Sequence, residues 1–208
     1  MDLPGIDNIV RMIFRDGTVR RSVIGLTVLS LAAAMACSSA AVQTHFSADA
    51  DLEYYEQVGV VPFRSLAADR LAGEKVTVEF VTALFASDLF DVIDYGIFVH
   101  GVAKVTGSRS PTDGVTAKQL RDIAKETGVQ GVFEGTVSHY ETFASGNNRF
   151  PVISLEVRLL DAATGRVVWS ATVTERGGPK TPLIGIGEVR TLGELSQKVC
   201  RRLVEELE

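Results

Sequence analysis

The amino terminus holds the feature that most limits what this chain can become. Residues 23–35 form a continuous apolar run, which is preceded by four arginines and followed by Ala36 and Cys37. The run is shorter than the roughly 20 residues that a membrane-spanning helix needs, and small residues end it. A basic segment, an apolar segment and a small-residue boundary together predict a signal peptide that is removed during export.

The place of Cys37, directly after Ala36, makes this prediction more specific. The segment resembles the lipobox of bacterial lipoproteins, in which the cysteine matching Cys37 receives a diacylglycerol thioether and becomes the new amino terminus. Ala34 and Met35 depart from the residues usual in that motif. An ordinary signal peptide cut after Ala36 and an uncleaved short anchor are the alternatives. By resemblance to enteric lipoprotein sorting, Ser38 favours the outer membrane of a bacterial envelope, with the domain in the periplasm.

The rest of the chain has the composition of one globular domain. Its 208 residues are 46% hydrophobic and 23% charged, enough to bury a core. The net charge of -5 and the dispersed basic residues give no basic face, so we expect no nucleic-acid partner. Two cysteines are too few for a metal cage or a disulfide framework. We therefore predict a signal peptide over residues 1–36, starting at Met1 or Met12, a lipidated amino terminus and flexible tether over 37–55, and an α/β domain over 56–208.

Hydrophobic periodicity predicts the first half of this domain. Residues 57–62 are a short apolar run, typical of a strand buried on both faces. Residues 90–94 form a second short strand, and residues 95–104 fit a helix or a strand equally well. Between the strands, residues 73–87 have helical spacing. The apolar residues that this helix would turn inward are Val76, Phe80, Val81, Leu84 and Phe85.

The second half begins with a capping box. Thr116 and Gln119 open a helix that buries Leu120 and Ile123 and stops at Gly128. Three β segments follow at 131–140, 151–161 and 166–176, and the last two alternate as a hairpin. An amphipathic helix over 191–206 ends the chain. The order β-α-β-(α)-α-β-β-β-α predicts a single α/β domain, a mixed β-sheet with helices packed on its faces.

In this order, the segments 58–63, 88–93, 124–135 and 157–170 resemble the superfamily that shares the fold of the TolB amino-terminal domain. It includes the curli-secretion lipoprotein CsgG and the penicillin-binding-protein activator LpoB. The resemblance implies a non-catalytic envelope protein that binds other envelope proteins. The connections 141–149 and 177–187 are too short for the transmembrane hairpins of the curli-secretion member, so the activator type fits better.

Few residues suggest chemistry. His139 and Glu141 are two apart without a nearby third ligand, so we predict no metal, no cofactor and no catalytic residue. Two connections carry apolar side chains, which commonly mark an interface, although packing back over a helix end is an equal alternative. The candidate partner-binding residues in these connections are Phe143, Asn147, Phe150, Leu183, Ile184 and Ile186.

The sequence thus favours a lipid-anchored, non-catalytic envelope lipoprotein that binds another envelope protein. Membrane attachment would go through the lipid on Cys37, and a homodimer or small ring is compatible with this role. The alternative is an accessory subunit of a curli-type export assembly without its own transmembrane segments. An enzyme comes third, because no set of nucleophile, base and orienting residue is recognisable.

Overall fold

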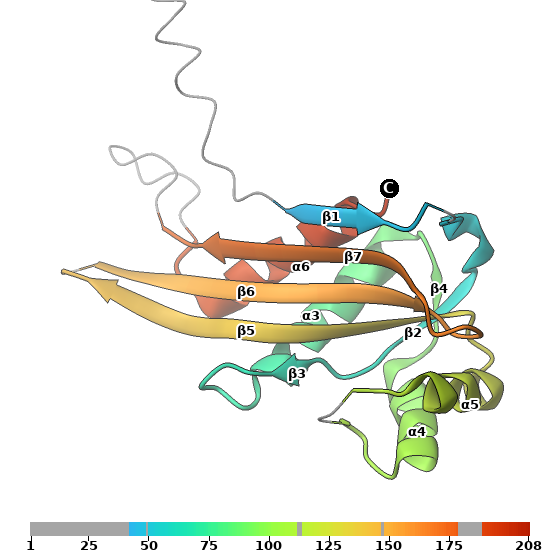
Figure 1. Ribbon diagram of the computed structural model, residues 1–208. Coiled ribbons are helices and arrows are strands. Elements are labelled where there is room, and N and C mark those ends of the chain that lie inside the picture. The colour runs from blue at the N-terminus through green and yellow to red at the C-terminus, as the bar shows by residue number, and fades with distance from the viewer. Residues whose placement is uncertain (1–41, 49, 112–113, 147, 179–188) are drawn as a thin grey trace, which may run out of the picture. The chain divides into compact units, whose positions relative to one another are not determined.

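The computed structural model describes residues 42–48, 50–111, 114–146, 148–178 and 189–208. They form one seven-stranded mixed sheet in the order β1-β7-β6-β5-β2-β4, with β3 paired to β5 beside this path (Figure 1). The strands are β1 (Gln43–Phe46), β2 (Gln57–Val60), β3 (Arg64–Ser65), β4 (Asp91–Val92), β5 (Gly131–Ser145), β6 (Asn148–Asp161) and β7 (Val167–Arg176). The helices are the 3-10 turn η1 (Leu52–Tyr54), α3 (Ala72–Ser87), α4 (Tyr95–Thr106), α5 (Ala117–Thr127) and α6 (Leu192–Glu205).

The predicted fold class is confirmed. β2 runs parallel to β4 and β5, whereas β5, β6 and β7 form an antiparallel meander. The ambiguous segment 95–104 is the helix α4, which Asp94 caps by accepting a hydrogen bond from the Ile97 amide. Gly107, at φ 77°, ends this helix in the left-handed conformation that glycine adopts readily.

Strand β5 carries side chains into two separate cores. Its adjacent residues Val132 and Phe133 are both fully buried, but they belong to different clusters of buried side chains. Successive side chains of a strand point to opposite faces of the sheet. The two clusters therefore lie on opposite faces.

The larger core lies between the sheet and the helices α3 and α6. Ring contacts run from Phe63 through Phe80 and Phe133 to Trp169, with centroids 5.3, 5.4 and 6.3 Å apart. Thr77 joins α3 to the loop after β2, because its hydroxyl accepts from the Phe63 amide at 2.8 Å and donates to the Gly73 carbonyl of its own helix at 2.7 Å.

The smaller core lies under α4 and α5, which cover only one end of the opposite face (Figure 1). Here the Phe98 ring of α4 packs directly on Gly59 of β2. A Cβ atom at position 59 would overlap the ring, so only glycine permits this approach. Among the elements that the structure describes, no helix covers the rest of this face.

The two helices predicted after residue 115 are both confirmed. The Thr116 capping box opens α5, and Gly128 ends it at φ 82°. A second capping box, between Thr191 and Glu194, opens α6 and was not predicted. The predicted hairpin of β6 and β7 is also found, and in it Leu159 pairs with Trp169 and Val157 with Ala171.

The prediction of a flexible tether up to residue 55 is wrong for its second half. Residues 43–46 form β1, which pairs antiparallel with residues 169–172 of β7. The Thr44 hydroxyl also donates to the Glu206 carboxylate at 3.0 Å. The buried Tyr55 donates to Asp161 at 3.2 Å, so the segment after β1 is fixed as well. The folded domain therefore includes β1 and does not begin near residue 56.

Two further expectations need correction. Phe85 was predicted to face inward from α3, but it is exposed, while Val76, Phe80 and Leu84 are buried. Residues 141–149 are not a loop, because β5 and β6 extend to Ser145 and Asn148 and pair in register up to the turn.

Candidate functional site

Cys37, the predicted lipid-attachment residue, lies outside the described residues. Five residues separate it from Gln43, where β1 begins. No helix within the described ranges is long and apolar enough to cross a membrane.

The far end of the β5–β6 hairpin brings together the predicted partner residues Phe143 and Phe150. They lie on the two strands of the hairpin, not in a loop, and they are directly paired in the register. Phe143 is 57% exposed, whereas Phe150 is half-buried. The third residue predicted here, Asn147, lies outside the described residues.

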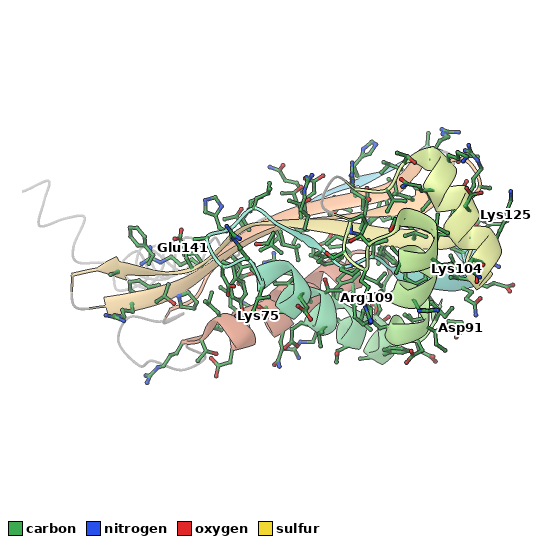
Figure 2. The ribbon with its side chains drawn as sticks, turned by 90° about the horizontal axis from the view of Figure 1, so that it is seen from below. Lys75, Asp91, Lys104, Arg109, Lys125 and Glu141 are labelled. Carbon is green, nitrogen blue, oxygen red and sulfur yellow. The ribbon has the colours of Figure 1, made fainter. Side chains whose placement is uncertain are left out.

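Arg176 of β7 completes this end of the sheet. Its guanidinium lies 4.0 Å from the centre of the Phe150 ring, and it pairs in register with Val152. Because Phe150 and Val152 are two apart on one strand, they point to the same face of the sheet. We call the residues Phe143, Phe150, Val152, Arg149 and Arg176 the hairpin tip. Figure 2 shows the neighbouring Glu141 near this end of the sheet, with Lys104 and Lys125 at the other.

The remaining predicted partner residues, Leu183, Ile184 and Ile186, lie outside the described residues. The two ends of their segment meet at the hairpin tip, where the Gly178 amide donates to the Val189 carbonyl at 3.0 Å. Phe150 packs closely on Gly178, since a Cβ atom there would lie 2.9 Å from the ring. The two predicted connections therefore do lead to one region.

A second apolar surface, which was not predicted, runs from the N-cap residue Leu71 along α3. Leu71, Val78 and Phe85 are spaced seven residues apart, and each is more than half exposed. Residues at this spacing share one side of a helix. We call these three residues the α3 stripe. The seven-residue spacing of these side chains could have revealed the surface. The other side of α3 is also apolar, however, and the prediction considered only one buried side.

The uncovered part of the sheet is polar. Arg158 of β6 pairs with Glu134 of β5 at 2.5 Å, and the hydroxyls of Ser154 and Thr174 lie 2.9 Å apart. A pocket of about 90 Å³ opens here beside Arg64 and the loop at Pro111. Opposite charges are paired across its walls, so no single charged ligand is favoured.

Within the described residues, the candidate metal ligands His139 and Glu141 and the thiol of Cys200 do not come together in one site. His139 and Glu141 are exposed neighbours on β5, and within the described ranges no group of three or more His, Cys, Asp and Glu could hold a metal ion. Cys200 is fully buried under α3, with its Sγ 3.8 Å from the Val76 carbonyl. Burial raises the pKa of this thiol far above its usual range, which keeps it protonated and unreactive.

PelC from Paraburkholderia phytofirmans, solved as a dodecamer, superposes with a TM-score of 0.56 at 20% identity, over 81% of this chain and 97% of PelC. Lipoprotein GNA1162 from Neisseria meningitidis superposes with a TM-score of 0.52 at 20% identity, over 72% of this chain and 98% of that protein. The chain has their fold.

The carboxy-terminal domain of LpoB from Salmonella enterica is also similar, with a TM-score of 0.44 at 19% identity over 58% of this chain and 82% of that domain. The predicted resemblance is confirmed for the fold by PelC and lipoprotein GNA1162, whose TM-scores exceed 0.5. No protein-family model and no curated protein sequence matches the chain.

Proposed function

We propose that this protein is a lipid-anchored, non-catalytic envelope lipoprotein that binds another envelope protein. One observation carries the proposal: a domain with the fold of lipoprotein GNA1162 begins six residues after a cysteine placed as in a lipobox. A diacylglycerol on Cys37 would hold the domain at a membrane, because each buried methylene contributes about 0.8 kcal/mol. The same placement supports the removal of residues 1–36 as a signal peptide and a location in the bacterial envelope, with Ser38 favouring the outer membrane.

The first test is the intact mass and the cell fraction of the protein expressed in a bacterial host. We expect a mature species that begins at Cys37, carries added lipid mass and sediments with membranes. The Cys37→Ala variant should lack both the lipid and the cleavage. An unlipidated product cut after Ala36, or an uncleaved chain in both variants, would refute the anchor.

The α3 stripe is the surface that we assign to the protein partner. Its three apolar side chains recur every two turns, from the N-cap residue Leu71 along one side of α3, whose other side is already buried against the sheet. A photo-reactive amino acid at Val78 should form a cross-linked species in intact cells, and the same group at the exposed Lys118 of α5 is the control. Equal cross-linking from both positions would argue against a specific site.

Self-assembly is the second candidate, since the similar PelC forms a dodecamer. In this case the partner is a further copy of the chain, as in an accessory subunit of an export assembly. Light scattering of the detergent-extracted lipoprotein separates the two functions. A monomer would exclude the ring, and a closed oligomer that Val78→Ser and Phe85→Ser dissociate would favour it.

A further inference from the structure

The hairpin tip has a surface that the protein-binding role does not explain. Phe143 is more than half exposed, and Phe150 and Val152 are only half-buried on the same face. Apolar side chains that stay exposed next to basic groups are typical of surfaces that enter a membrane interface.

The charge at the tip suits an anionic surface. Arg176 and the exposed Glu141 lie on the face of Phe150 and Val152, because both pair in register with Val152. The exposed Arg149 precedes Phe150 directly, so it points to the other face of the same hairpin end. Glu175 also lies close by, but it is buried and paired with Lys198 and Arg202 of α6. The tip is therefore basic on balance, and it can attract phosphate headgroups.

The opposite end of the sheet exposes acidic side chains near β1, while the cations Lys104 and Lys125 of α4 and α5 pair there with Glu126 and Asp122. β1 leads there into η1, whose surroundings expose Asp51, Glu53 and Glu56 (Figure 1). These carboxylates would be repelled by anionic headgroups. The two ends of the domain are thus unequal toward a membrane, and the hairpin tip is the favoured one.

The length of chain before β1 brings this end within reach of the bilayer. Six residue steps separate Cys37 from Gln43, so the lipidated cysteine lies at most about 21 Å from the start of β1. Gln43 pairs with Thr172, which pairs with Glu156, and from there β6 extends eight residues to Asn148. At about 3.3 Å per residue, the tip projects about 26 Å past the start of β1, which matches the reach of the anchor.

We infer that the hairpin tip is a second membrane contact, which takes a bilayer surface with anionic headgroups as its ligand. Phe143 enters the interface, with Phe150 and Val152 beside it, and Arg149 and Arg176 meet the phosphates. This inference rests on the proposed lipid anchor, because a lipid on one residue limits the distance of the domain from the membrane but does not set its orientation. The tip supplies the orientation, and it leaves the α3 stripe free for a protein.

Spin labelling of the mature lipoprotein tests this directly. Phe143→Cys introduces one reactive thiol, since Cys37 carries the lipid and Cys200 is buried. Ala163→Cys, in the exposed turn between β6 and β7 at the other end of the sheet, is the matched control. Each labelled protein is reconstituted into vesicles of phosphatidylethanolamine with a minority of phosphatidylglycerol, and collisions of the label with oxygen and with a water-soluble nickel chelate are measured.

We expect the label at 143 to gain collisions with oxygen and to lose collisions with the nickel chelate, while the label at 163 stays aqueous. Adding Arg149→Glu should return the label at 143 toward water on these vesicles. If the label at 143 stays as accessible to nickel as the control while the protein remains vesicle-bound, the tip is not a membrane contact. Failure of the anchor itself is recognised separately, because the intact mass then lacks the lipid.

Discussion

Glu175 is the charged residue with a buried side chain among the described residues. It points from β7 toward α6, where the amino group of Lys198 pairs with one carboxylate oxygen and Arg202 Nη1 lies 3.3 Å from the other. A buried carboxylate is tolerated when cations and hydrogen bonds compensate its lost hydration. The pair of cations on one helix therefore fixes how α6 lies on the sheet.

Replacing Glu175 with Gln should lower the free energy of unfolding. The amide keeps the shape of the side chain but leaves two cations facing each other, partly exposed, at a loss of about 1–3 kcal/mol. Urea denaturation measures this change. Glu156→Gln, on the exposed face of β6, is the control and should stay within about 0.5 kcal/mol of the wild type. Equal stability of both variants would show that the ion pairs do not hold α6.

Cys200 gives a second prediction for a single residue. Burial raises the pKa of its thiol, so almost no thiolate forms at neutral pH and the sulfur is also out of reach of reagents. We expect an aromatic disulfide reagent to modify Cys200 only when the protein unfolds in denaturant. The exposed thiol of Ala163→Cys should react at once in the folded protein. Rapid modification of Cys200 without denaturant would contradict its placement under α3.

At the scale of the elements, the position of α4 depends on a single residue of β2. Its Phe98 ring occupies the space that a side chain at Gly59 would need. Gly59→Ala forces the ring away from β2, and such overpacking typically destabilises a protein by about 1–3 kcal/mol. Thermal unfolding of the variant tests this prediction.

The same substitution elsewhere provides the control. Gly193 lies in the first turn of α6, and a Cβ atom there meets nothing within 4 Å. Gly193→Ala should stabilise the protein by up to about 1 kcal/mol, because alanine favours a helix over glycine. If Gly59→Ala lowers the stability and Gly193→Ala raises it, the loss at position 59 arises from the α4–β2 contact. A loss of stability in both would refute this explanation.

The elements that the sequence predicted are those with a strong local pattern. The Thr116 capping box, the stop at Gly128 and the alternation of β6 and β7 depend on neighbouring residues, and all three are found. β1 has only four residues, mostly exposed, and its pairing with β7 is separated by more than a hundred residues. No local pattern reveals such an edge strand. Residues 141–144 at the end of β5 are all exposed, so they showed no hydrophobic period.

The candidate site was predictable only in part. Phe143 and Phe150 were recognised by their apolar character, and the structure places them in one region. Phe85 was assigned to the wrong side because α3 carries apolar residues on both sides, which periodicity alone cannot rank. The grouping of Arg176 with Phe150 depends on the pairing of β6 with β7, so only the folded sheet brings these side chains together.

At the scale of the whole molecule, the four-residue strand β1 covers the edge of the longer strand β7. A chain that begins at Ala48 would leave the backbone of residues 169–172 without its partner strand. We expect this chain to melt at a lower temperature than one that begins at Ala40, and to associate as its concentration rises, since open strand edges pair with one another. Differential scanning fluorimetry and analytical ultracentrifugation measure the two effects.

A side-chain substitution distinguishes the effect of the open strand edge from the effect of the Phe46 ring. Phe46→Ser in the chain that begins at Ala40 keeps the backbone pairs with β7 but removes a half-exposed ring. It should stay monomeric in dilute solution. Association of this variant to the same extent as the shortened chain would mean that the ring, not the open edge, controls self-association.

The antiparallel pairing of β1 also decides how the domain bears a mechanical load. A force on the residues before Gln43 enters the domain at the start of β1, where Gln43 pairs with Thr172. A pull along the strand axis shears the four pairs, so they must break together, whereas a pull away from the sheet peels them one after another. The domain should thus withstand tension parallel to its sheet far better than tension across it, and β1 is the part that yields first.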